Sequence, residues 1–190
     1  MAKKIRIVPV KVRLVDIDFI WVFRAIHDDI LQRRHAGRGA EPGKVVIWSG
    51  WYFPRDDPNQ QIMYATMWLA MLRLMQDDVV IVGVAGNHFP GDGADTEIDS
   101  VPAVWTSQDF PLIVVGGADR FGEGPYDSKT GDKVTCWSIA QSVECAAEGE
   151  QGNTYYEGSC VGELILSGPL FGHRLRTHNL TSRLDVKALL

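Results

Sequence analysis

The sequence has few cysteines, no excess of positive charge and no long apolar run. Disulfide-rich, nucleic-acid-binding and membrane-spanning proteins need these features. The three cysteines in 190 residues are too few and too scattered for a disulfide framework. Lys and Arg number 19 against 24 Asp and Glu, and the net charge of −5 argues against binding to nucleic acid or an anionic membrane surface. The longest apolar stretch, 62–75, contains Arg73 and is shorter than the roughly 20 residues that a bilayer requires. We therefore expect neither a nucleic-acid nor a membrane partner.

Short sequence motifs for leaders, nucleotides and metals are missing as well. The apolar segment 7–10 is too short for a signal peptide, so no compartment is predicted. The stretch 83–86 lacks the third glycine of the dinucleotide fingerprint, and no G-x-x-x-x-G-K-[ST] occurs. The cysteines show no C-x-x-C and no zinc-finger spacing to histidine. Nucleotide and zinc binding are therefore not expected.

An acidic loop is the one segment with metal-ligand chemistry. Its oxygen ligands are of the kind that calcium prefers, but their spacing departs from the EF-hand pattern. A solvated acidic loop is the simpler interpretation, so no cofactor is assigned and a structural calcium ion stays an alternative. The four acids are Asp92, Asp95, Glu97 and Asp99.

What the sequence does contain is an alternation of helical and strand patterns typical of one globular domain. One helix is predicted to start at Asp16 or Asp18, either of which offers an N-cap, and to stop at the glycines at 37 and 39. His27 lies just outside its apolar stripe and is most simply a surface histidine. A second is predicted from Asn59, a plausible N-cap, to about Gln76; it is apolar on nearly all sides, so it should be well buried. Strands are predicted at 5–12, 45–48, 79–85, 112–116 and 163–166, with short β pieces and loops over 122–158.

The order of these elements predicts the fold class. Strands joined by long helical crossovers pair in parallel, so we expect an α/β fold with a doubly wound, mostly parallel sheet and helices on both faces. Ligands of such sheets collect at the carboxyl ends of the strands. Those ends carry Ser49-Gly50-Trp51 and Ala85-Gly86-Asn87-His88. Gly-Asn is also common in plain turns, so the dipeptide alone leaves both a functional and a structural interpretation open.

Several segments, taken in order, resemble the subtilisin-like serine proteases (subtilases). The stretch 78–87 (DVVIVGVAGN) is similar to the family's strand ending in A-G-N, and 110–119 (FPLIVVGGAD) to its strand of the form V-I-x-V-G-A. The resemblance runs from about residue 4 to 170 and implies a partial subtilase-like peptidase domain over 1–172, a three-layer sandwich incomplete at both ends. Residues 173–190 are expected to form an irregular tail. The other matching segments are 7–12, 45–51, 101–103 and 156–169.

The resemblance also implies roles for particular residues. Asn87 corresponds to the side-chain donor of the oxyanion hole, which hydrogen-bonds the charge that develops on the scissile carbonyl oxygen. Val84-Ala85-Gly86 corresponds to a wall of the main specificity pocket, and Ser49-Gly50-Trp51 to an extended edge that pairs with the substrate backbone. Trp51 stands where the family often has glycine and would crowd the pocket. The implied partner is a polypeptide substrate or extended peptide.

The catalytic motifs of the family are not found. D-[TS]-G and H-G-T-H are absent, and the nearest match to G-T-S is Leu180-Thr181-Ser182-Arg183, with leucine in place of glycine. Without a base the Ser182 hydroxyl stays protonated at neutral pH, so Ser182 is not expected to be a nucleophile.

Two main hypotheses follow from this mixture of matches and absences. The first is a serine endopeptidase domain that is catalytically incomplete in the chain as given, either inactive or dependent on further segments. The alternative is a non-catalytic protein that binds extended peptides in the retained groove. A third and weaker hypothesis is a domain that binds a small molecule, in which the A-G-N sequence is a coincidence. Because the absent parts would leave apolar sheet surface uncovered, we also expect marginal stability or self-association.

Overall fold

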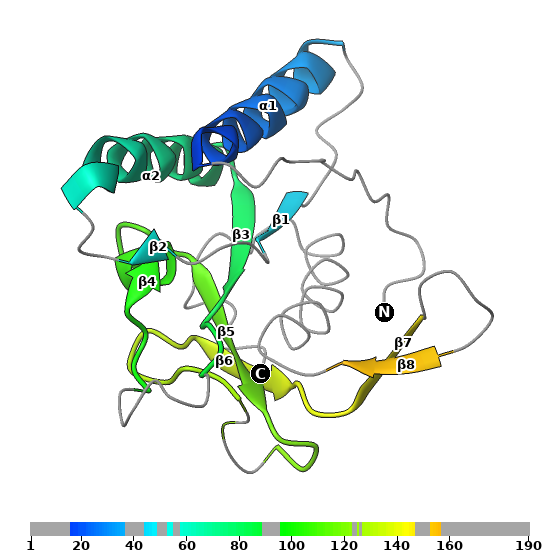
Figure 1. Cartoon of the computed structure of the whole chain (residues 1–190). Coiled ribbons are helices and arrows are strands. Elements are labelled where there is room, and N and C mark those ends of the chain that lie inside the picture. The colour runs from blue at the N-terminus through cyan, green and yellow to red at the C-terminus, as the bar shows by residue number, and fades with distance from the viewer. Residues whose placement is uncertain are drawn as a thin grey trace.

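The computed structural model describes residues 16–36, 44–48, 53–54, 58–88, 96–122, 125, 127–146 and 153–156. Within them a four-stranded sheet has the order β1-β3-β5-β6, and every neighbouring pair is parallel. Figure 1 shows this sheet with the helices to one side. The mostly parallel α/β fold predicted from the sequence is therefore confirmed. The sheet strands are β1 (Lys44–Trp48), β3 (Val79–Val84), β5 (Ile113–Ala118) and β6 (Cys136–Ile139).

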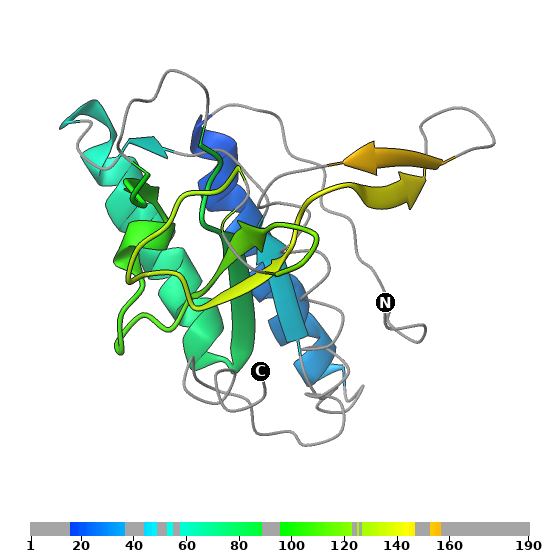
Figure 2. The same cartoon turned by 90° about the horizontal axis from the view of Figure 1, so that it is seen from below.

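Two small antiparallel pairs lie outside the main sheet. β2 (Phe53–Pro54) pairs with β4 (Ser100–Val101), and β7 (Val143–Ala146) pairs with β8 (Asn153–Tyr156). The β7–β8 hairpin projects away from the sheet (Figure 2). The strands predicted at 5–12 and 163–166 lie outside the described residues.

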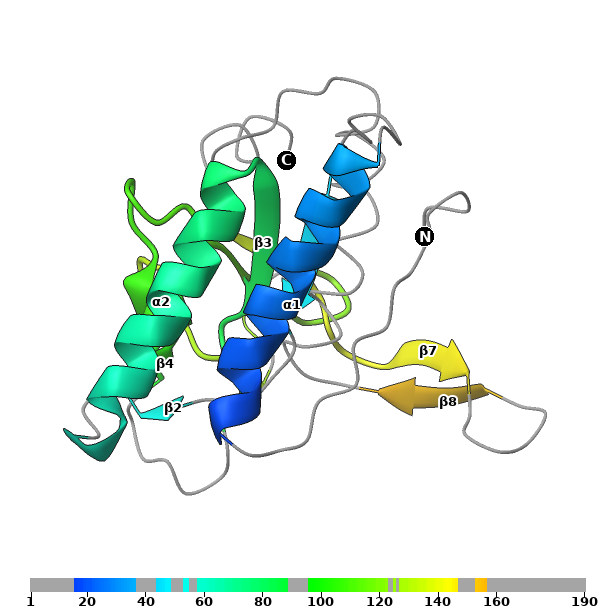
Figure 3. The same ribbon diagram turned by 90° about the horizontal axis from the view of Figure 1, so that it is seen from above.

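Both described helices pack against the same face of the sheet. α1 (Asp16–His35) and α2 (Gln61–Gln76) run side by side across β3 (Figure 3). Phe23 and Ile30 of α1 are buried in one cluster with Met67 of α2 and with Ile81 and Leu112 beneath them. The opposite face holds a smaller cluster that includes Val82 and Ile113. Helices on that second face stay a prediction. Neither described helix is long and apolar enough to cross a membrane.

The structure corrects two predictions for α2. The chain enters this helix through a 3-10 turn, η1 (Pro58–Gln60), and the N-cap is Gln60 with no side-chain cap, so the predicted Asn59 cap is wrong. The helix is also less buried than predicted, because Ile62 is 84% exposed and Leu69 is 49% exposed. Only the stripe that faces the sheet and α1 is buried, and it repeats at helical spacing. Its members are Met63, Tyr64, Met67, Met71 and Leu74.

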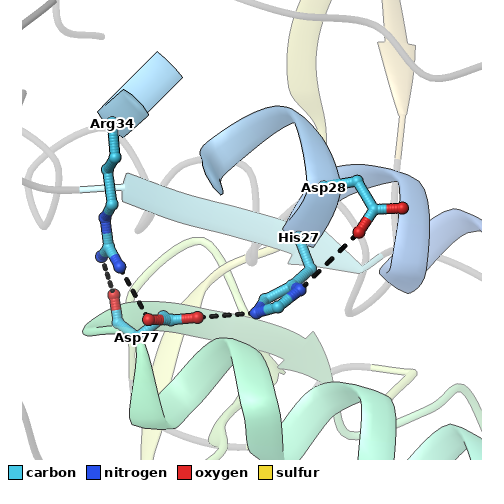
Figure 4. Close-up of polar contacts among 4 residues, drawn as sticks. All are labelled: His27, Asp28, Arg34 and Asp77. Carbon is cyan, nitrogen blue, oxygen red and sulfur yellow. Dashed lines mark hydrogen bonds and ion pairs between the residues drawn. The ribbon is translucent and has the colours of Figure 1, made fainter. Parts of the chain in front are cut away.

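A polar cluster joins the two helices at the amino end of β3. Asp77 is the C-cap of α2. Its Oδ1 accepts a hydrogen bond from Arg34 Nη1 at 2.6 Å, and its Oδ2 lies 2.6 Å from His27 Nε2 (Figure 4). Arg34 Nη2 also donates to the backbone carbonyl of Asp77 at 2.7 Å. His27, predicted to be a surface histidine, is 21% exposed and contacts a residue 50 positions along the chain, so it is only partly at the surface. We call His27, Arg34 and Asp77 the helix clasp.

The helix clasp predicts a pH-dependent contribution to stability. Partial burial raises the pKa of Asp77, but hydrogen bonds from Arg34 and His27 outweigh burial and hold that pKa below its ordinary value of 3.8. A carboxyl with a depressed pKa stabilises the fold above its ordinary pKa and loses this effect as the pH falls through the depressed value. Asp77→Asn is therefore expected to lower the free energy of unfolding by about 1 kcal/mol at neutral pH.

Urea unfolding at a series of pH values measures this effect. The difference between the wild type and Asp77→Asn should shrink as the pH drops below 3.8, where the wild-type carboxyl takes up its proton. Asp29→Asn is the matched control, because Asp29 pairs with Arg33 only along the surface of α1, at 2.7 Å. Surface pairs of this kind contribute little, so Asp29→Asn should change the free energy by less than about 0.5 kcal/mol. A difference that persists unchanged at low pH would contradict the assignment to the Asp77 carboxylate.

Candidate functional site

The carboxyl ends of the central strands meet at one edge of the sheet, as the sequence predicts. Trp48, the last residue of β1, is in register with Gly83, and Val84, the last residue of β3, is in register with Val115. The ends of β1 and β3, after which the two predicted substrate segments follow, therefore lie side by side. Ser49, Gly50 and Trp51 follow Trp48 directly but lie outside the described residues.

β3 delivers the remaining predicted site residues to this edge. Val84 is 4% exposed and Ala85 is fully buried, and the Ala85 N–H donates to the Val115 carbonyl at 2.8 Å, which extends the sheet by one residue. Gly86 takes a positive φ of +101°, a conformation in which a side chain would be strained. Asn87 follows at once and is half-buried. β3 is thus followed by a change of backbone conformation at Gly86, which we call the Gly86-Asn87 turn, and Asn87 comes directly after it.

A segment that the sequence does not single out holds this turn. The Lys129 N–H donates to the Gly86 carbonyl at 2.7 Å, and the neighbouring Ser128 Oγ accepts from the Gly117 N–H at 3.0 Å. The segment 128–130 therefore connects the end of β3 with the end of β5. It lies in a stretch rich in Gly, Ser and charged residues without apolar periodicity, so the sequence shows only a loop there. No local signal would have identified these contacts.

The side chain of Lys129 forms an ion pair beside the turn. Its Nζ lies 2.6 Å from Asp99 Oδ2, and the Lys129 side chain is 12% exposed. Ser100 Oγ donates to the other oxygen of Asp99 at 3.0 Å. Partial burial raises the pKa of Asp99, but the hydrogen bonds from Lys129 and Ser100 outweigh burial and hold that pKa below its ordinary value. Asp99 is therefore charged at neutral pH and is the counter-ion of the Lys129 ammonium group.

The acidic loop does not form a metal site in the part of the chain that the structure describes. No group of three or more His, Cys, Asp and Glu side chains is arranged there to hold an ion. Asp99, one of the four acids, is paired with Lys129. Asp92 and Asp95 lie outside the described residues, as does Ser182.

The arrangement can stabilise negative charge at a fixed point. An amide side chain donates N–H groups, and a turn anchored to a buried parallel strand keeps such a donor in place. A donor that needs no reorganisation can favour an oxyanion over a neutral carbonyl. The described residues thus form a rigid edge with a candidate donor, Asn87.

The fold is subtilisin-like, and this chain covers part of it. One similar solved structure is the prenylagaramide maturation protease PagA, with a TM-score of 0.60 and 18% identity over 97% of this chain and 59% of that chain. The PatG macrocyclase in complex with a peptide gives a TM-score of 0.62 and 14% identity over 92% of this chain and 47% of that chain. The self-cleaved protease domain of PatA gives 0.58 and 22% over 90% of this chain and 58% of that chain.

These similarities define the fold rather than the activity. The chain spans between 47% and 59% of the length of these three structures. No family model and no curated protein sequence matches it. One fold can carry different chemistries, so the fold alone does not fix the activity of this chain.

Proposed function

We propose that this chain is the substrate-binding and oxyanion-stabilising part of a subtilisin-like serine endopeptidase domain. The observation that supports this most directly is the Gly86-Asn87 turn at the carboxyl end of β3, in a fold shared with maturation proteases. Asn87 would donate its side-chain N–H to the developing oxyanion. Val84, Ala85 and Gly86 would form one wall of the specificity pocket, and Ser49, Gly50 and Trp51 the edge along which a peptide lies.

Hydrolysis would need residues that supply the three missing motifs. A serine hydroxyl becomes a nucleophile only beside a base that takes its proton, and the base in turn needs a group that orients it. The sequence holds neither D-[TS]-G nor H-G-T-H. The 190 residues are therefore proposed to contribute to catalysis only together with residues that carry these motifs.

A second candidate function is the binding of extended peptides without catalysis. The observation that favours it is the same absence of motifs, together with a similar fold in the PatG macrocyclase, which was solved in complex with a peptide. An extended peptide can bind to the edge of a sheet through main-chain hydrogen bonds, with its side chains in pockets. The edge around Val84 and Trp48 could serve this purpose whether or not a nucleophile is present.

Reading the native transcript and assaying its full protein product separates the two functions. We expect the open reading frame to extend through D-[TS]-G, H-G-T-H and G-T-S motifs, and the product to react with a fluorophosphonate and to cleave fluorescein-labelled casein. The control is the same protein with the serine of its G-T-S motif changed to alanine. A product that binds labelled casein peptides by fluorescence anisotropy but never reacts with the fluorophosphonate would support the second function and overturn the first.

A further inference from the structure

Lys129 contacts the Gly86-Asn87 turn through its backbone and is itself fixed through its side chain. Its N–H donates to the Gly86 carbonyl at 2.7 Å, while its Nζ lies 2.6 Å from Asp99 Oδ2. The side chain of Lys129 is 12% exposed, whereas that of Asp99 is 57% exposed, so the ion pair lies at the surface with the lysine stem covered. An ammonium group in that position depends on its carboxylate partner.

The partner of Lys129 is held from the other side. Ser100, which is 4% exposed, donates its hydroxyl hydrogen to Asp99 Oδ1 at 3.0 Å. The backbone on either side of the ion pair is also joined, because the Ile98 N–H donates to the Thr130 carbonyl (3.0 Å) and the Thr130 N–H donates to the Thr96 carbonyl (2.6 Å). The segments 96–100 and 128–130 therefore form one connected unit beside the turn.

The Gly86 carbonyl is a sensitive point in this arrangement. It belongs to the same peptide group as the N–H of Asn87, so its orientation, together with rotation about the Asn87 N–Cα bond, decides where the Asn87 side chain leaves the backbone. Gly86 has no side chain to restrict rotation, and its φ of +101° lies in a region that other residues rarely occupy. Some contact outside the turn must therefore fix the orientation of this peptide group, and the Lys129 N–H is such a contact.

We propose that Lys129 and Asp99 are positioning residues that hold the Gly86-Asn87 peptide group, and with it the Asn87 side chain, in one orientation. The inference rests on the proposed function of Asn87 for its catalytic consequence. The geometric part concerns only how the turn is held. A displacement of a reacting or charge-stabilising group by about 1 Å can cost up to about 10²-fold in rate, so loss of the ion pair is expected to reduce catalysis without any loss of substrate contact.

The geometric part is tested by hydrogen–deuterium exchange at single amides in the full native protein. Asp99→Asn keeps the shape of the side chain but removes the charge that fixes Lys129. We expect exchange of the position-129 amide to rise at least about tenfold, while the Ala85 amide, which bonds within the sheet, stays protected. Asp29→Asn, which breaks the surface pair with Arg33, is the matched control and should leave both amides unchanged. An unchanged rate at position 129 in Asp99→Asn would overturn the inference, whatever the activity.

The catalytic part is tested by kinetics of peptide hydrolysis with Lys129→Met, Asp99→Asn and the double variant. Each should lower kcat about tenfold with KM within about twofold, and the double variant should be no worse than either single one, because both break one interaction. Lys129→Arg should restore most of kcat, and Arg33→Met should have no effect. A rise in KM at constant kcat, or additive losses, would contradict a positioning role. If Asn87→Ala leaves kcat unchanged, the proposed function of Asn87 fails. The hydrogen–deuterium exchange of Asp99→Asn still decides whether the ion pair holds the Gly86-Asn87 peptide group.

Discussion

Replacement of Asn87 by alanine is expected to lower kcat for peptide hydrolysis by about 10² to 10³ in the full protein, which corresponds to about 3–4 kcal/mol of transition-state stabilisation. The side-chain amide lies directly after a turn that the sheet and Lys129 hold in place. The proposed role requires its N–H group to meet an oxyanion without reorganisation during the reaction. A neutral ground-state carbonyl gains much less from the same donor, so KM should stay nearly constant.

Two further variants make this result specific. Gln76→Ala also removes an amide side chain, but Gln76 is exposed at the end of α2, next to the amino end of β3, and should leave kcat unchanged. Asn87→Asp keeps the size of the side chain and replaces donors by a negative charge, so it should be at least as damaging as Asn87→Ala. A raised KM with unchanged kcat in Asn87→Ala would instead mean that the amide contacts bound peptide in the ground state. That outcome would favour the peptide-binding function.

The part of the site that the sequence predicts is the part encoded locally. A buried strand followed by Gly86-Asn87 is contiguous, and the parallel sheet brings its end to the same edge as the end of β1. The contacts that hold the turn are different in kind. Gly86 and Lys129 are 43 positions apart, and Asp99 and Lys129 are 30 apart. No periodicity or turn signal links such positions, so only the folded structure shows that they act together.

The fold shows the same division. β3 and β5 are predictable because a run of valine and isoleucine indicates a strand covered on both faces. Which residues of α2 are buried is not predictable in this way. The helix has more apolar residues than one face can bury, and one of them, Ile62, projects into solvent. The partnership of His27 with Asp77 is also invisible in sequence, since it depends on how α1 crosses α2. Pattern therefore predicts which elements form, and packing decides which side chains they bury.

Phe110 lies just before β5, where its ring contacts Trp68 of α2 and Trp105. Its ring is 1% exposed; it stacks on Trp68 of α2 with centroids 5.8 Å apart and meets the edge of Trp105 at 5.9 Å. A tight turn fixes its backbone, because the Phe110 N–H donates to Ser107 Oγ at 3.1 Å and the Ser107 N–H donates to the Phe110 carbonyl at 3.1 Å. The segment that leads into β5 is thus anchored to the helix layer through this one ring.

Phe110→Ala is therefore expected to reduce the free energy of unfolding by about 3–5 kcal/mol, because it removes a buried ring and leaves a cavity that a fixed backbone cannot close. Urea unfolding followed by circular dichroism measures the loss. Phe121→Ala is the matched control: the same atoms are deleted, but Phe121 is 69% exposed, and the change should stay within about 0.5 kcal/mol. Because a loss of this size can exceed the whole stability of a domain, Phe110→Leu supplies a milder variant that keeps most of the buried volume. Equal effects of Phe110→Ala and Phe121→Ala would show that the Phe110 ring does not anchor β5 to the helices.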